Sequence, residues 1–162
     1  MSIPTRLASY LDQRDADYDV RTHELSRTSA ETARSAHIPP HQLAKSVVLE
    51  DDDGCLLAVL PADSTVQLAE ISDLLDRRAL RLAKENRIAE LFDGCDRGAV
   101  PAVGMAWGVE TIVDEDLISN NDEIYMESGD HERLLHMSGQ QFQQLMGEQR
   151  HGRFCKSNST VH

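Results

Sequence analysis

The stretch HQLAKSVVLEDDDGCLLAVLPAD (residues 41–63) decides the fold. It predicts two apolar strands, near residues 45–50 and 55–60, joined by the acidic turn DDDG, in which Gly54 can take a positive φ. Lys45 stands at the entrance of the first strand, and two interpretations of it remain open. Its stem can cover apolar surface while its head stays in water. Alternatively, its head faces a cleft and holds an anionic or carbonyl-bearing group.

The rest of the chain predicts a mixture of helices and strands. Ile3, Leu7 and Leu11 recur at four-residue spacing, which is typical of an amphipathic helix. Thr28 and Glu31 form a capping box that opens a short helix. Further helices are expected at 65–78, 84–92 and 138–146. Strands are expected at 17–24 (half-buried), 79–83, 109–113, 122–128 and 132–138.

These elements together indicate the fold class and the domain organisation. They predict a mixed α/β (α+β) domain over residues 1–146, with a mixed, largely antiparallel sheet or partial barrel flanked by helices. From Gly147 onward the sequence is polar and aperiodic, so we expect a disordered tail over residues 147–162. Arg150, Arg153 and Lys156 in this tail either contact phosphates weakly or are simply solvated.

The composition excludes several classes of protein. The three cysteines, Cys55, Cys95 and Cys155, form no CxxC pair, so we expect neither a disulfide framework nor a metal site. No cofactor is expected either, because the common nucleotide-fold motifs are absent. The net charge of −12 argues against sequence-independent nucleic-acid binding, yet it allows a local grip on one end of a nucleic acid. No apolar run reaches the length of a membrane span, and we expect a cytoplasmic protein.

Three segments stand out as places for chemistry. They are Lys45, the loop GAVPAVG (residues 98–104) and the turn SGDH (residues 128–131). The loop is either a surface connection or a source of main-chain groups that no strand ladder uses. The turn is either an ordinary hairpin or the place of a functional His131. Cys95 invites interpretation as a nucleophile, but a loop cysteine without an assigned base is more often inert.

In their order along the chain these segments resemble a known family. LAKSVVLEDDDG (43–54), LPAD (60–63), LFDGCDRGAVPAVG (91–104), GVETIVDEDL (108–117) and EIYMESGDHERLLHMSGQQFQQL (123–145) are similar to the YbaK/EbsC-type aminoacyl-tRNA editing domain. This domain also occurs inserted in bacterial prolyl-tRNA synthetases. The resemblance extends over about residues 20–146.

The resemblance implies roles for particular residues. The family's lysine falls on Lys45, which would act in catalysis, and its Gly-x-His turn falls on Gly129 and His131. Its Gly-x-x-x-Pro substrate loop begins at Gly98 and here comprises Gly98, Ala99, Val100, Pro101 and Ala102. The proline stands one place early, and Ala102 takes its usual position, so the specificity of relatives does not transfer directly.

The resemblance also implies an activity. We expect a hydrolase that cleaves the ester of mischarged tRNA in trans, by direct attack of water assisted by the ribose hydroxyl. The small loop residues favour a small amino acid, with alanine, cysteine, serine and proline all open. The expected partners are the aminoacylated acceptor end of tRNA and an aminoacyl-tRNA synthetase. Two alternatives are a non-catalytic module that binds an aminoacyl group or nucleotide or associates with a synthetase, and an unrelated hydrolase that uses His131. The main expectation is that Lys45, the loop and the turn line one cavity.

Overall fold

The hairpin predicted from residues 41–63 forms the centre of the computed structural model, which describes residues 3–24 and 28–157. β2 (Leu43–Asp51) and β3 (Gly54–Pro61) pair antiparallel, and Gly54 has a φ of +144°. The Asp51 carboxylate closes the turn by accepting from the amides of Asp53 and Gly54, at 2.8 and 3.1 Å. The Arg77 guanidinium, 2.6 Å away, together with these amides holds the pKa of Asp51 at about 2.

The strands form a mixed sheet around this hairpin, which confirms the predicted fold class. The order is β1-β8-β7-β2-β3-β6-β9, with β5 paired to β2 outside this path. β2 runs parallel to β7, β3 parallel to β6 and β6 parallel to β9, while the other pairs are antiparallel. The bounds are β1 Asp19–Thr22, β5 Arg81–Leu82, β6 Glu110–Asp114, β7 Glu123–Glu127, β8 Arg133–Ser138 and β9 Arg150–Gly152. A separate pair joins β4 (Ser64–Val66) to β10 (Cys155–Ser157).

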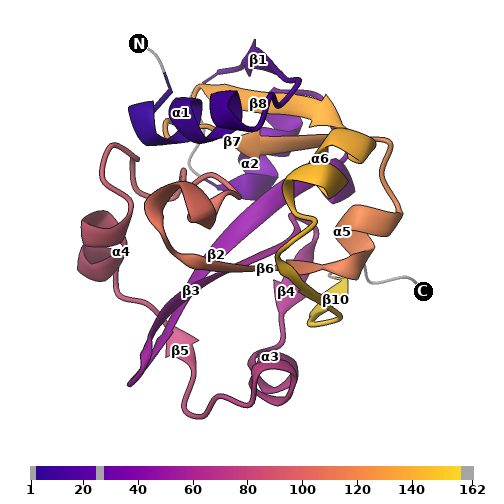
Figure 1. The fold of residues 1–162 in the computed structure, drawn as a ribbon. Coiled ribbons are helices and arrows are strands. Elements are labelled where there is room, and N and C mark those ends of the chain that lie inside the picture. The colour runs from indigo at the N-terminus through magenta and orange to yellow at the C-terminus, as the bar shows by residue number, and fades with distance from the viewer. Residues whose placement is uncertain (1–2, 25–27, 158–162) are drawn as a thin grey trace.

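Helices cover the sheet and enclose its apolar side chains. They are α1 Thr5–Gln13, α2 Ser29–Ser35, α3 Leu68–Leu75, α4 Glu85–Leu91, α5 Glu115–Ser119 and α6 Gly139–Leu145, with short 3-10 turns at η1 Pro40–Gln42 and η2 Gly104–Trp107. Figure 1 shows α1 and α6 at the end that carries β1 and β8, and α3 and β5 at the opposite end. No helix in the described part of the chain has the length and apolar character needed to cross a membrane.

The largest apolar cluster lies on one face of β2 and β3. It contains Ala44 and Val48 of β2, together with Leu7 and Leu11 of α1, as the helical spacing predicts. A second cluster, on the other face, contains Leu49 and Leu60. Because successive side chains of a strand point to opposite faces, this separation fixes which face each residue of β2 serves.

Several local predictions are confirmed and others are wrong: the helix expected over 65–78 is confined to α3, and its first residues belong to β4. Thr28 caps α2 by accepting from the amide of Glu31, at 3.1 Å, and Ser138 caps α6 by accepting from Gln141, at 3.0 Å. The strand at Asp19–Thr22 was predicted to be half-buried, but all four residues are exposed because β1 lies at the edge of the sheet. Residues 115–119 form α5, which we did not predict; Asp114 caps it by accepting from the amide of Asp116.

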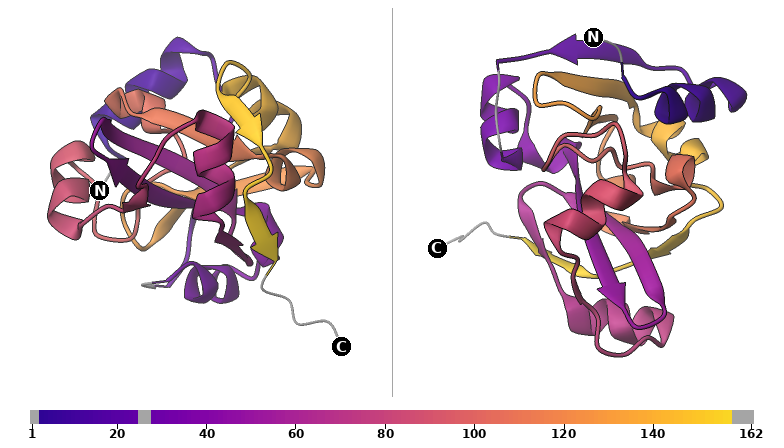
Figure 2. Two further views of the ribbon diagram at one scale, coloured as in Figure 1. Left: turned by 90° about the horizontal axis from the view of Figure 1, so that it is seen from below. Right: turned by 90° about the vertical axis from the view of Figure 1, so that its left-hand side faces the viewer.

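The chain after Gly147 corrects the prediction of a disordered tail. β9 extends the large sheet and β10 pairs with β4, so residues 150–157 are folded. Figure 2 shows this last segment, in yellow, extended along the side of the molecule. Phe154, only 1% exposed, anchors it, and its amide donates to the buried Asp114 carboxylate at 2.8 Å. One buried aromatic ring and strand pairing outweigh the polar composition. Residues 158–162 lie outside the described residues.

This anchor gives a stability prediction. Phe154→Ala should lower the free energy of unfolding by about 3–5 kcal/mol, because it leaves a cavity among packed apolar side chains. Val20→Ala is the matched control: Val20 is 45% exposed, and its truncation should change stability by less than about 0.5 kcal/mol. Urea unfolding monitored by circular dichroism measures both, and equal small effects would contradict the anchoring role of Phe154.

Candidate functional site

One edge of β2 is only partly paired. Its other edge pairs with β3 along nearly the whole strand. On the open edge β2 pairs with β7 at Leu43 and Ala44 and with β5 at Leu49 and Glu50. Among the described residues, no strand pairs with residues 45–47 on this edge. We call this gap the β2 window.

Ser46 directs its main-chain groups into the β2 window. The carbonyl of Val48 accepts from the Ala83 amide at 2.9 Å, so it points to the open edge. Residues two apart on a strand direct their N–H and C=O groups to the same edge, so those of Ser46 point there too. The Ser46 hydroxyl is also buried, and it has no hydrogen-bond partner among the described residues. Ser46 therefore offers three polar groups to a ligand.

One cavity lies at the β2 window, and a second cavity shares two of its lining residues. The first, about 220 Å³, is mostly apolar, and its lining is Ser46, Val47, Val48, Leu82, Ala83, Glu85, Ile88, Gly98 and Val100. We call it the apolar chamber. The second, about 550 Å³, is larger, and its lining is Gly98 with four charged or polar side chains, those of Glu85, Asp96, Arg97 and His131. We call it the polar chamber. The two share Gly98 and Glu85 in their linings, so they lie next to each other.

The structure brings together the loop and the turn that the sequence singled out. The amide of Asp96 donates to the carbonyl of Gly129 at 2.7 Å, and His131 Nε2 bonds to the carbonyl of Arg97. A carbonyl can only accept, so Nε2 donates this bond, and in the neutral ring Nδ1 is then an acceptor. Nδ1 is buried and has no partner among the described residues. His131 thus holds the start of the loop through Nε2, while Nδ1 has no partner among the described residues.

The other predicted loop residues have mainly structural positions. Ala99 and Ala102 are fully buried, and Pro101 is buried as well. Gly129 has a φ of +108°, and a Cβ there would lie 2.8 Å from the ring of Pro4, so only glycine fits this turn. Of the predicted substrate-binding residues, Gly98, Val100 and His131 line the two chambers. The other four, Ala99, Pro101, Ala102 and Gly129, line neither chamber.

Lys45 lies apart from these chambers. Alternation places its side chain on the face opposite Ala44 and Ser46, and its ammonium donates to the carbonyl of Ser64. Lys45 therefore lines neither chamber, so neither of these two cavities is the expected one formed by Lys45, the loop and the turn. Burial lowers the pKa of Lys45, and within this part of the chain no carboxylate forms an ion pair with it. A half-buried ammonium with no carboxylate partner is well placed to receive an anionic ligand.

Two other groups have structural explanations. Burial, with contributions from Asp93 and Asp96, raises the pKa of Cys95 to about 12, so its thiol stays protonated and is a poor nucleophile. Asp114, Asp116 and Cys155 bring their potential metal-ligand atoms within 4.8 Å of one another. However, Asp114 caps α5 and binds the Phe154 amide, and Asp116 pairs with Arg153 at 3.0 Å. These bonds account for the cluster without a metal.

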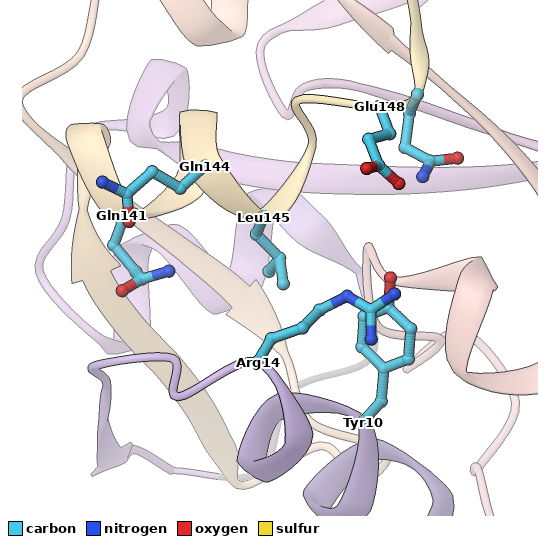
Figure 3. A pocket seen from close by; sticks show the side chains of 7 residues that line it. Tyr10, Arg14, Gln141, Gln144, Leu145 and Glu148 are labelled. Atoms are coloured by element: carbon cyan, nitrogen blue, oxygen red, sulfur yellow. The ribbon is translucent and has the colours of Figure 1, made fainter.

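A third hollow lies away from the β2 window, between α1 and α6. Its volume is about 230 Å³, and its lining is polar, with several glutamines from α6 and the segment after it. Figure 3 shows Arg14 lying across the ring of Tyr10, where its guanidinium carbon is 3.8 Å from the ring centre. Glu148 lies on the same hollow and offsets the charge of Arg14, so this hollow has no strong preference for an anion.

The fold and the two chambers define a mixed α/β protein with a small binding site at an open strand edge. The chain belongs to the aminoacyl-tRNA editing domain family, whose sequence profile matches residues 23–145. This confirms the resemblance drawn from the motifs. No curated protein matches the sequence significantly.

Solved structures share the fold at low sequence identity. A hypothetical protein, APE2540, superposes with a TM-score of 0.81 at 22% identity, covering 93% of this chain and 99% of its own. A candidate trans-editing enzyme for prolyl-tRNA synthetase gives a TM-score of 0.80 at 23% identity, with 94% and 96% covered. A signal-transduction candidate from Marinobacter aquaeolei VT8 gives 0.77 at 21% identity, with 99% and 32% covered.

The sequence analysis missed Ser46, Glu85 and Arg97. Arg97 pairs with Glu85 at 3.4 Å across the mouth of the chambers, and both side chains are largely exposed. A signal for Ser46 was present in the sequence, because it is a polar residue inside an apolar strand and follows Lys45 directly. No comparable signal marks Glu85 and Arg97, because surface charges of this kind are common.

Glu127, the last residue of β7, gives a pH prediction. It is 7% exposed, and its Oε1 has no hydrogen-bond partner among the described residues. Burial, with a smaller effect of the Asp130 carboxylate, raises the pKa of Glu127 from 4.5 to about 8. Between these two values the unfolded chain has lost the proton that the folded protein keeps. The free energy of unfolding should therefore fall as the pH rises from about 4.5 to 8.

Glu127→Gln removes this titration. Unfolding in urea at pH 5, 6.5 and 8.5 should show a smaller decline for the variant than for the unsubstituted protein, and a more stable variant at pH 8.5. Glu132→Gln, at an exposed position, is the control and should keep the original slope. An unchanged slope in Glu127→Gln would show that another group causes the decline.

Proposed function

We propose that this protein is an aminoacyl-tRNA deacylase that hydrolyses, in trans, the ester of tRNA carrying a wrong small amino acid. The observation that carries this proposal is the pair of chambers at the β2 window. Apolar residues make up most of the lining of the smaller one, charged and polar residues make up most of the lining of the larger one, and Gly98 lines both. An aminoacyl-adenosine has the same division, with a side chain at one end of the ester and a ribose and phosphates at the other.

The two chambers suggest how the ligand lies. The amino-acid side chain enters the apolar chamber, where Val48, Ile88 and Val100 limit its size. The terminal ribose and its phosphate occupy the polar chamber, where the exposed Arg97 guanidinium can exchange Glu85 for a phosphate. The ester then lies near Gly98 and the main chain of Ser46.

Direct attack by water suits these groups. The water oxygen bonds to the ester carbonyl carbon, and the carbonyl electrons move to its oxygen. The main-chain N–H of Ser46 stabilises that oxyanion. The intermediate then breaks the bond between carbon and the ribose oxygen, which takes one proton from the water, while the second passes to solvent. The neighbouring ribose hydroxyl and Nδ1 of His131 are the proposed groups that orient the water.

Lys45 keeps a proposed role in this scheme. It adjoins Ser46 in sequence and occupies the opposite face of β2 at the same window. Its ammonium can leave the Ser64 carbonyl for a phosphate of the acceptor end, because no carboxylate within the described residues holds it by an ion pair. The net charge of −12 makes such a local contact necessary, since the rest of the surface repels RNA. The aminoacylated acceptor end is the proposed ligand, and the cytoplasm is the proposed place of reaction.

The deacylation of a panel of mischarged tRNAs tests this function. With the best substrate, Lys45→Ala should lower kcat/KM by about 10- to 100-fold, because a charge-assisted hydrogen bond is lost. Lys156→Ala, at an exposed position in β10, is the matched control and should have little effect. Lys45→Ala with full activity would remove Lys45 from the site.

The panel also separates the alternatives. Binding of aminoacyl-tRNA without turnover of any ester would support the non-catalytic binding module. Neither binding nor turnover would overturn the proposed function as a whole. Binding of a prolyl-tRNA synthetase is a separate question, which pull-down with the purified synthetase answers.

A further inference from the structure

One residue that lines the apolar chamber has a buried polar group with no partner among the described residues. Its lining is built from valine, leucine, isoleucine, alanine and glycine, apart from Ser46 and the exposed Glu85 at its mouth. The Ser46 hydroxyl is buried, and no described residue forms a hydrogen bond with it. A buried hydroxyl left in this state costs about 1–3 kcal/mol, so a compensating ligand group is the physical expectation.

We infer that Ser46 sets the side-chain specificity of the site, and that the ligand is an esterified small amino acid with a side-chain hydroxyl, serine being the smallest. This inference rests on the proposed function. It narrows the choice among alanine, cysteine, serine and proline, which the sequence leaves open.

The position of Ser46 supports this assignment. Its side chain shares a face with Ala44 and Val48, and Val100 packs against the same apolar cluster. The hydroxyl therefore projects toward the loop that closes the apolar chamber, away from the second core on the other face of β2. A side chain that enters between Val48 and Val100 meets this hydroxyl.

The chemistry of the chamber determines the preferred ligand. A hydroxyl-bearing side chain can both donate to and accept from Ser46, so both groups are satisfied inside an apolar wall. A methyl side chain leaves the Ser46 hydroxyl unpaired. A site that hydrogen-bonds a substrate hydroxyl rejects the analogue that lacks it far better than an apolar pocket can.

The test compares two esters that differ by one oxygen atom. Seryl- and alanyl-esters of one and the same tRNA are hydrolysed by the full-length protein, by Ser46→Ala, by Ser46→Thr and by the control Ser72→Ala in α3. The unsubstituted protein should favour the seryl ester by about 10- to 100-fold in kcat/KM. Ser46→Ala should lose most of this ratio through a fall in seryl hydrolysis, with a much smaller change for the alanyl ester.

The two remaining variants guard against a merely structural effect. Ser46→Thr keeps a hydroxyl and should keep the preference for the seryl ester, while Ser72→Ala should match the unsubstituted protein. A preference for the alanyl ester, or an equal loss on both esters in Ser46→Ala, overturns the inference. The equal loss would assign the hydroxyl to the amino group or ribose, which the two substrates share.

A binding measurement keeps this inference separate from the proposed catalysis. Seryl- and alanyl-adenosine with an amide in place of the ester cannot be hydrolysed, and calorimetry gives their Kd values. The seryl amide should bind about 10-fold more tightly, and Ser46→Ala should abolish the difference. Failure of all ester hydrolysis with this difference intact would refute the deacylase and leave the specificity of Ser46 standing. Equal Kd values for both amides would refute the specificity.

Discussion

The candidate site depends on the incomplete pairing of one edge of β2. A strand inside a sheet normally uses all its main-chain N–H and C=O groups, because buried groups without partners are costly. Here β7 occupies the edge at residues 43–44 and β5 occupies it at residues 49–50. The β2 window between them leaves the main chain of Ser46 available, held rigid by β3 on the other side. A rigid strand with free main-chain groups is a precise place to bind a polar ligand.

The loop and the turn take their positions from this gap. β7 ends at Glu127, just beyond its two pairs with β2, and the chain then turns at Gly129. The hydrogen bonds from Asp96 to Gly129 and from His131 to Arg97 join this turn to the loop. Segments about 30 residues apart therefore close the same opening. In this arrangement the unpartnered polar groups of the candidate site come from the main chain, Ser46 and His131.

Local chemistry explains which parts of the fold the sequence could predict. The β2/β3 hairpin follows from two apolar runs and a glycine turn, and the caps at Thr28 and Ser138 follow from residue types at fixed spacing. The order of the motifs along the sequence predicts Gly98, Val100 and His131 as site residues. In the structure these three residues line the two chambers. Strand alternation alone separates the side chains of Lys45 and Ser46. Which of the two faces the loop was beyond prediction, because tertiary packing of the loop decides it.

The C-terminal segment is a second case in which tertiary packing decides what the sequence alone does not predict. Its polar composition predicts disorder, yet Phe154 and the partner strands β4 and β6 order it. Its arginines serve this docking: Arg153 pairs with Asp116, and Arg150 donates to the carbonyl of Leu74 at 3.1 Å. The side chains of Arg150 and Arg153, which the sequence analysis considered for phosphate contacts, are thus used to hold the C-terminal segment. In a protein with a net charge of −12, the proposed function would rest on Arg97 and Lys45 for much of the attraction for a phosphate. Recognition that rests on so few cations favours the end of an RNA over its length, since each phosphate contact adds to affinity and to salt dependence.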